Sequence, residues 1–430
     1  MDKLTLVRSR GSYRWDSFGV RYLDFTSGGI FAAIFGSNSL YMRNAISRSS
    51  SLCCYEAHYE SPEALRLKDM LKEMTGYESV CLFSTGAEAT EALWRTCRVA
   101  TGKPGVWGGL VNPDEVGNTD PAPQPDAMHG MTLGALIMAG KMALPNRGMF
   151  RELGADFEGK GQEHTSCAIF EPYHAASAQF HRESPTMDRL RERIKEFPDL
   201  HFCCDEIQGG LGRTGKLFAL EWYQPSMRTE FVTLGKALGG GLPLSALLGP
   251  RDILEDPHVV EHAHLHSTHS GNPLMCVAGI AVLERLQKDN MINEVYRKGL
   301  LLSDNLKDCG VRVHAGKGLL AGLEMEGPLM TTKVVEACRR RGLLVVDTGR
   351  KWVKLGPAFN ISDEQIVAGC KILKEAIEEV KDANATSCGD SGSEPGQEQG
   401  LLREAGLPDG ELGQGEVAAG TPGNEATDPG

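Results

Sequence analysis

The residues with the clearest chemical potential lie between positions 205 and 241, where two short apolar runs each lead to an ionisable side chain. Asp205 ends the first run, Gln208 follows three residues later, and Lys236 follows the run 231–234. Ligands bind at the carboxyl ends of parallel strands, so we expect these side chains to meet there. A lysine can hold an aldehyde as a Schiff base, and a carboxylate can keep a pyridine nitrogen protonated. The pair predicts a site for pyridoxal phosphate.

The same stretch also matches two nucleotide-binding motifs in part. Residues 210–215 read G-x-G-x-x-G, and residues 210–216 match most of a P-loop. A P-loop needs Ser or Thr after its lysine, and this chain has Leu217 there. A dinucleotide site needs a helix packed behind the glycines and an acid after the next strand, whereas Glu230 precedes that strand. Both nucleotide sites remain minor alternatives.

A run of histidines raises the question of a metal. Residues 262, 264, 266 and 269 are all His, but the only acidic residue among them is Glu261. The twelve cysteines show no C-x-x-C spacing, which is more typical of free thiols in a reducing cytoplasm than of a zinc site or a disulfide framework. We therefore predict a cytoplasmic protein without a bound metal.

The elements that must position these side chains alternate from about residue 60 onward. Ser61-Pro62 begins a helix in the preferred way, and a short apolar run at 80–83 leads into another helix. Strands separated by helices predict an α/β fold with a large, mostly parallel sheet flanked by helices. After residue 270 the pattern changes to helices, two strand-like runs and a last helix that Ser362 opens with a capping box, which predicts a smaller α+β domain.

These patterns predict four regions. Residues 1–45 would contribute to the small domain, 46–271 would form the large cofactor-binding domain, and 272–381 would form the small C-terminal domain. Residues 382–430 hold ten Asp or Glu, one Arg, eleven Gly, four Pro and no aromatic residue, which predicts a disordered acidic tail.

Charge and hydropathy exclude some partners. The net charge is −12, of which the tail carries −9, so the body is nearly balanced at −3. The body lacks a strongly basic stripe, which argues against a nucleic-acid partner. No run of eighteen apolar residues and no signal-peptide pattern occurs, so we expect no membrane partner.

Seven motifs in sequence order resemble those of class III aminotransferases, a subgroup of the fold-type I pyridoxal phosphate enzymes. The similarity spans about residues 15–380, and two of the motifs, at 84–88 and 129–132, also resemble dialkylglycine decarboxylase. The resemblance implies a fold-type I transferase fold. The motifs are YLDFTSG (22–28), FSTGAEATEAL (83–93), MHGMT (128–132), FEP (170–172), DEIQGGLGRTG (205–215), LGKALGGGLPLSA (234–246) and HSTHSGNPL (266–274).

Two of these motifs point to the cofactor phosphate. Thr85, Gly86 and Ala87 lie at a strand-to-helix turn, where backbone N–H groups and the helix dipole favour a phosphate, although a plain helix cap would look the same. The resemblance implies that Thr268 reaches the phosphate of a neighbouring subunit, which requires at least a homodimer. The alternative is that Thr268 caps the following helix.

Three other residues match positions near the cofactor ring. The resemblance places His129 close to the ring, and it places Gln208 at the phenolic oxygen, to which a side-chain amide can donate. Met128 stands where the family usually stacks an aromatic residue, and a thioether can also pack on a ring. Simple core packing is an equal alternative for Met128.

Two residues match positions that bind substrate. Glu171 is the acid of the E-P motif, and Lys354 stands where the family places an arginine against a carboxylate. Lysine keeps the positive charge but lacks the planar fork that makes two hydrogen bonds. We expect Glu171 to pair with Lys354 and to open for a substrate carboxylate.

The combined features predict ping-pong transfer of an amino group from an amino acid or amine donor to a keto or aldehyde acceptor. The reaction would pass through a Lys236 aldimine, with Lys236 then acting as general base while Asp205 supports the ring. A decarboxylase like dialkylglycine decarboxylase or an aminomutase would use the same groups. A pyridoxal phosphate-binding relative with lost catalysis, serving as a binding or regulatory protein, is the alternative of another class, and Met128 and Lys354 favour it slightly.

Overall fold

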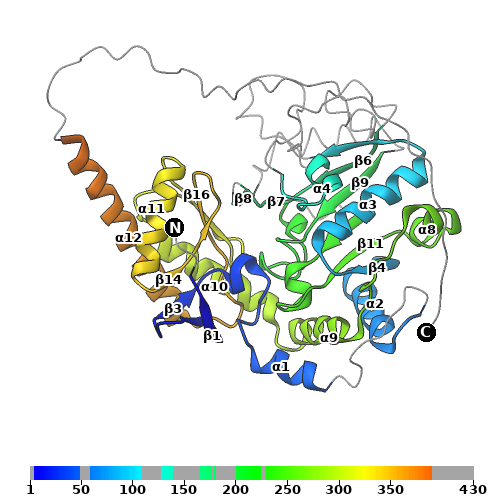
Figure 1. The fold of residues 1–430 in the computed structure, drawn as a ribbon, viewed down its shortest axis with the longest axis horizontal. Helices are drawn as coiled ribbons and strands as arrows, with labels where there is room; N and C mark the ends of the chain where they lie inside the picture. Colours follow the sequence, from blue (N-terminus) through cyan, green and yellow to red (C-terminus); the bar gives the residue numbers. More distant parts are fainter. Residues whose placement is uncertain are drawn as a thin grey trace, which may run out of the picture. The chain divides into compact units, whose positions relative to one another are not determined.

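The computed structural model describes residues 4–48, 59–108, 127–138, 165–176, 178–180, 200–223 and 229–389, and its central element is a six-stranded sheet (Figure 1). All neighbouring strands of this sheet are parallel except β11, which runs antiparallel to both of its neighbours. The prediction of a mostly parallel α/β sheet is therefore confirmed. The strands in spatial order are β4 (Ser79–Phe83), β11 (Ser245–Gly249), β10 (Phe231–Leu234), β9 (His201–Asp205), β6 (Thr165–Phe170) and β5 (Gly105–Gly108).

Both faces of this sheet are buried, which explains why its strands are continuous apolar runs in the sequence. Along β9, Phe202 and Cys204 pack into one core and Cys203 packs into the other. Helix α3 (Gly86–Thr101) covers the Cys203 face, while α2 (Pro62–Thr75) and α9 (Pro273–Lys288) contribute to the opposite core (Figure 1).

A second, antiparallel sheet follows later in the chain. Its strands in spatial order are β12 (Arg312–His314), β13 (Ala321–Glu324), β16 (Trp352–Leu355) and β15 (Val346–Asp347). The helices of this region are α10 (Met291–Leu306), α11 (Pro328–Arg340) and α12 (Asp363–Gly389). Helix α12 continues eight residues past Lys381, where we expected the ordered body to end.

The N-terminal strands join this later region through backbone pairing. Strands β1 (Leu6–Arg10), β2 (Tyr13–Asp16) and β3 (Arg21–Asp24) form a sheet whose last member is β14 (Leu343–Leu344), parallel to β3. The remaining elements are η1 (Ser27–Phe31), α1 (Leu40–Ser47), α4 (Leu133–Met138), β7 (Tyr173–His174), β8 (Gln179–Phe180), η3 (Ala219–Trp222), η4 (Lys236–Gly239), α7 (Arg251–Leu254) and α8 (Pro257–Ala263).

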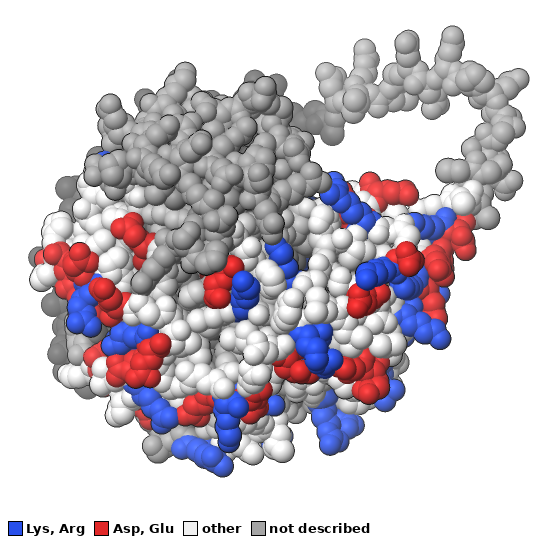
Figure 2. All heavy atoms as spheres, turned by 180° about the vertical axis from the view of Figure 1, so that it is seen from behind, with Lys and Arg blue, Asp and Glu red and all other residues white. Residues whose placement is uncertain are grey.

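The chain divides into two units, Met1–Ala385 and Thr386–Gly430. Most of the predicted tail, from residue 390 onward, lies outside the described residues. On the face seen in Figure 2, acidic and basic side chains of the described residues are interspersed. No helix in the described ranges is long and apolar enough to cross a membrane.

Arg213 is a fully buried cation that joins distant segments. Its Nη1 donates to the carbonyl oxygens of Pro357 (2.6 Å) and Leu319 (3.3 Å), and its Nη2 donates to the Ser27 hydroxyl and the Phe31 carbonyl. No carboxylate of the described residues pairs with it. Burial lowers the pKa of Arg213 to about 9, which leaves it charged at neutral pH. The guanidinium thus ties the glycine-rich loop to the N-terminal segment and to the later sheet region.

Replacing this arginine should destabilise the protein. We expect Arg213→Met to lower the free energy of unfolding by about 3 kcal/mol, because several buried carbonyls lose their donors. Arg297 is the matched control, since it also makes several hydrogen bonds but its side chain is 50% exposed. Arg297→Met should cost less than about 1 kcal/mol in the same urea titration. Equal losses in the two variants would contradict the role given to Arg213.

Candidate active site

Asp205 is held at the carboxyl end of β9 by two contacts. Its Oδ2 lies 2.8 Å from Nδ1 of His129, and its Oδ1 accepts a hydrogen bond from the Ile207 N–H at 3.0 Å. The side chains of His129 and Asp205 are 0% and 2% exposed. The His129 carbonyl in turn accepts from the Thr90 hydroxyl of α3. The carboxylate is therefore fixed in position and can present charge to a ligand.

Lys236 follows the neighbouring strand β10 and is the first residue of η4. Its φ of 34° lies in the left-handed region, which is uncommon for a residue other than glycine and costs on the order of 1 kcal/mol. Burial lowers the pKa of Lys236, and the negative charges of Asp205 and Glu171 oppose this effect. Burial therefore increases the fraction of neutral amine.

A cavity of about 400 Å³ brings most of the predicted site residues together. It extends from the end of the large sheet to the loop between β15 and β16. Its lining includes Gly86, Ala87, Met128, His129, Gln208, Lys236 and Lys354 of the predicted residues, together with Ile30, Gly130, Ala175, Ala176, Ile207, Val346, Asp347, Thr348 and Arg350.

The start of α3 forms one wall of this cavity. Thr85 is the N-cap and accepts from the Glu88 N–H, while the Glu88 carboxylate accepts from the N–H of Thr85 at 2.8 Å. Gly86 and Ala87 follow as the first two helical residues. Both predicted features, the helix cap and the helix N-terminus at the site, therefore occur together.

Ile207 packs between the start of α3 and the lysine loop, and sequence reasoning missed it. A Cβ on Gly86 would lie 2.8 Å from Ile207 Cδ1, and a Cβ on Gly235 would lie 3.2 Å from Ile207 Cγ2. Both glycines thus permit the close approach that places Lys236 beside the helix N-terminus. Its position two residues after Asp205, in the same motif, could have indicated that Ile207 lies at the site.

Glu171 holds the segment that carries Met128 and His129. The Glu171 Oε2 accepts a hydrogen bond from the Met128 N–H at 3.0 Å. Burial raises the pKa of Glu171 to about 7, and the charge of Asp205 adds to the effect while His129 opposes it. Met128 is 37% exposed and lines the cavity, so it is not a simple core residue.

Lys354 is buried on β16 with different partners from those we expected. Its Nζ donates to the Ala175 carbonyl at 2.6 Å and to Gln208 Oε1 at 3.0 Å. The expected direct pair with Glu171 is not among its contacts in the described residues, because the Glu171 carboxylate turns towards the Met128 backbone. Burial, with the charge of Lys236 adding to it, lowers the pKa of Lys354 to about 7.

Thr85, Asp205 and Glu171 adjoin lining residues without lining the cavity themselves, and two other predicted features lie apart from it. Thr268 is exposed in the turn before α9, and Asn272 caps that helix by accepting from the Leu274 and Met275 N–H groups. The alternative in which Thr268 caps α9 is therefore wrong. The turn 210–215 packs against α10, since a Cβ on Gly215 would lie 2.8 Å from the Tyr296 Cβ. Its glycines serve packing, which removes the basis of the nucleotide alternatives.

The arrangement fits pyridoxal phosphate. A lysine, the N-terminus of a helix and His129 line one cavity, and His129 contacts the Asp205 carboxylate at the end of the adjacent parallel strand. These are the groups that an aldehyde, a phosphate and a protonated ring nitrogen require. The close packing at Gly86 and Gly235 holds the lysine and the helix near each other. Arg350 also lines this cavity, but it lies outside every motif, so sequence reasoning missed it.

Comparison with known proteins agrees with this chemistry. The sequence model for class III aminotransferases matches residues 1–377. The chain is 29% identical to the mitochondrial acetylornithine aminotransferase of Yarrowia lipolytica, covering 86% of this chain and 91% of that protein. It is 28% identical to the LysW-aminoadipate semialdehyde/glutamate semialdehyde transaminase of Sulfolobus acidocaldarius, and the match covers 89% of this chain and 97% of that protein.

A solved structure shares the fold. The adenosylmethionine-8-amino-7-oxononanoate aminotransferase of Methanocaldococcus jannaschii superposes with a TM-score of 0.73 at 23% identity, covering 88% of this chain and 94% of that one. This likeness supports the fold-type I architecture predicted from the motifs.

Proposed function

The chain belongs to the class III aminotransferases, and from this premise we propose that it transfers an amino group from a donor bearing a carboxylate to a keto or aldehyde acceptor in two half-reactions. It is a pyridoxal phosphate-dependent enzyme of the aminotransferase type. Its curated relatives are aminotransferases, so the decarboxylase, mutase and non-catalytic alternatives are not favoured.

The observation that carries this function is the placement of Asp205 and Lys236 at the ends of adjacent parallel strands, with Lys236 and His129, the partner of Asp205, lining one cavity. When bound, pyridoxal phosphate supplies an aldehyde that condenses with amines and a ring that accepts electrons. Asp205, held by His129 and the Ile207 N–H, would keep a proton on the ring nitrogen. Lys236 would then move the proton of the donor carbon, and its lowered pKa favours this role as a base.

The other residues would hold the cofactor. We assign its phosphate to the backbone of Gly86 and Ala87 next to the Thr85 cap, because the N-terminus of a helix attracts anions. Met128 and Ile207 would pack on the ring, and the Gln208 side chain would reach the phenolic oxygen. Glu171 would act indirectly by fixing the backbone of Met128.

The substrate carboxylate would bind between Lys354 and Arg350, the two cationic side chains other than Lys236 that line the cavity. Lys354 is held by Ala175 and Gln208, so it offers a point charge in a fixed place. Arg350 can supply the planar fork that Lys354 lacks. The relatives named for acetylornithine and for glutamate semialdehyde support a substrate that carries a carboxylate.

The depressed pKa of Lys354 predicts how donor binding depends on pH. Lys354 is mostly protonated below its pKa of about 7, and it loses its charge as pH rises through that value. We therefore expect KM for a carboxylate donor to rise between pH 6 and pH 8.5 in stopped-flow half-reactions. KM for a matched amine without a carboxylate should lack this rise.

Two variants of Lys354 separate its charge from its bulk. Lys354→Arg keeps its charge over this range and should flatten the rise in KM for the carboxylate donor. Lys354→Met should raise that KM roughly tenfold at pH 6, which corresponds to about 1.4 kcal/mol. The carboxylate assignment fails if all three proteins show the same KM profile for both donors.

We also propose that the enzyme is at least a homodimer in which Thr268 completes the site of its partner. Support comes from the motif that contains Thr268 and from its exposure away from the cavity of its own chain. Its hydroxyl would donate to the cofactor phosphate across the interface.

Hybrid dimers test this trans contact. Lys236→Ala and Thr268→Ala homodimers should each be impaired, the first almost completely. If Thr268 acts across the interface, a mixed dimer of the two variants contains one site with both residues intact. Refolding or coexpressing the two should restore up to about half of wild-type activity per hybrid dimer. No gain over the Thr268→Ala protein would show that Thr268 acts within its own chain.

For the cellular compartment we propose the cytoplasm. The cysteines of the described residues carry free thiols, and even the neighbouring Cys97 and Cys203 sulfurs are not bonded to each other. Free, buried thiols are typical of proteins in reducing compartments.

A further inference from the structure

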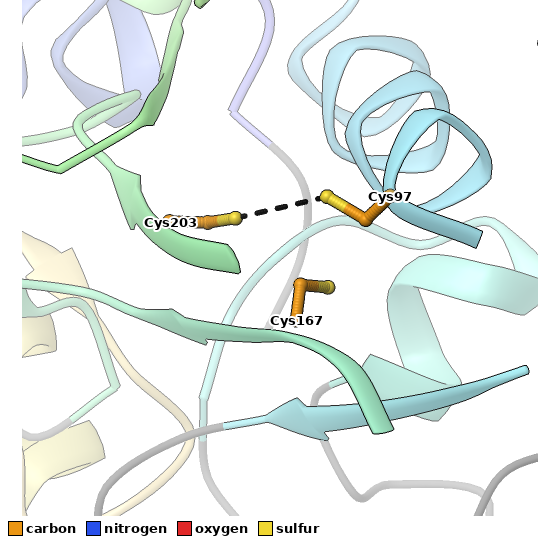
Figure 3. A group of neighbouring side chains, drawn as sticks. All are labelled: Cys97, Cys167 and Cys203. Atoms are coloured by element: carbon orange, nitrogen blue, oxygen red, sulfur yellow. Dashed lines mark hydrogen bonds between the residues drawn. The ribbon is translucent and has the colours of Figure 1, made fainter. Parts of the chain in front are cut away.

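Three cysteines that are far apart in the sequence converge in the core between α3 and the large sheet. Cys97 lies on α3, Cys167 on β6 and Cys203 on β9, and their three Sγ atoms all lie within 4.8 Å of one another. In Figure 3 the side chains of Cys97 and Cys203 point towards each other, and Cys167 lies beside the line between them. In the described part of the chain this is the one such group of three potential metal ligands.

The three cysteines are themselves fully buried in an apolar core. Each of the three residues is 0% exposed. They belong to the core between α3 and the sheet, which also holds Phe83, Ala89, Ala92, Leu93, Trp94, Val106, Ala135, Met138, Ile169, Phe231, Leu247 and Leu254. Any ligand bound here would therefore be a small species held mainly by the three sulfur atoms.

The spacing of the sulfurs suits three-coordinate binding. A metal–thiolate bond is about 2.3 Å long, so three sulfurs arranged trigonally around one ion lie about 4.0 Å apart. The Cys97 and Cys203 sulfurs are already 4.0 Å apart. The Cys167 sulfur lies within 4.8 Å of both, so a shift of less than about 1 Å would complete the triangle.

The donor set selects the kind of ion. Structural zinc sites have four ligands, and no fourth His, Cys, Asp or Glu of the described residues joins this group. Thiolates without nitrogen or oxygen ligands favour soft ions, of which Cu(I) accepts low coordination numbers. A bound cation would replace the protons of the coordinating thiols.

We propose that Cys97, Cys167 and Cys203 form a buried binding site for a soft, low-coordinate cation of the Cu(I) type. The site would link three elements that also carry the catalytic region: α3 begins at Gly86, β6 leads to Glu171 and β9 ends at Asp205. The occupied site fixes these elements to one another and should raise the thermal midpoint of the holoenzyme. The site is separate from the cofactor cavity, whose lining includes none of the three cysteines.

The test is an anaerobic titration of the reduced holoenzyme with Cu(I) against the chromophoric chelator bicinchoninate. All proteins carry Cys53→Ala and Cys54→Ala, because this adjacent pair could itself bind Cu(I). We expect this background to take up one equivalent, and the added changes Cys97→Ala or Cys203→Ala to weaken binding at least tenfold. The matched control is Cys276→Ala, which removes a buried free thiol outside the cluster and should leave binding unchanged.

Two results would overturn the proposal. One is failure of the background protein to take Cu(I) from the chelator, and the other is equal affinity in the Cys97→Ala and Cys276→Ala proteins. X-ray absorption on the copper-loaded background protein needs no cluster variant to fold. It should show three sulfur neighbours at about 2.3 Å, and a nitrogen or oxygen ligand would likewise overturn the proposal.

Discussion

The parallel pairing of β9 with β10 is the constraint on which the site depends. In this pairing Thr233 lies opposite Asp205, so the two strands end at nearly the same level. The residues that follow them, Ile207 after β9 and Lys236 after β10, line the same cavity. Asp205 and Lys236 are separated by thirty residues of sequence, yet the register alone brings them to one edge. A shift of one residue would turn every side chain of a strand to the other face and remove Asp205 from His129.

Around this edge, close packing gives the site its shape. Ile207 separates two backbone segments that only glycine allows to approach, at Gly86 and Gly235. Arg213 attaches the glycine-rich loop after β9 to the carbonyls of the N-terminal segment and of Pro357. The same motif therefore supplies the acid, the packing residue and the anchor, which explains why its residue types follow one another so closely along the chain.

The sequence was informative where chemistry follows from local spacing, and less so where it follows from long-range packing. The mostly parallel sheet, the cap at Thr85 and the pair Asp205 and Lys236 could all be predicted from short patterns. The partners of Lys354 could not, because Ala175 and Gln208 reach it from distant segments and displace the expected contact with Glu171. Arg350 lies in a loop without a motif, and the convergence of Cys97, Cys167 and Cys203 appears only when α3 packs on the sheet. The division into a large and a small domain and the role of Thr268 remain predictions.

The central claim is that Lys236 and Asp205 catalyse amino transfer with a bound cofactor. The visible absorbance of the purified holoenzyme tests this claim most directly. A carboxylate-bearing amino donor should convert the absorbance band of the bound cofactor, and a keto acid added afterwards should restore it. The Lys236→Ala protein should be unable to complete this cycle. A holoenzyme that forms no such band, or a Lys236→Ala protein that cycles as fast as wild type, would contradict the account.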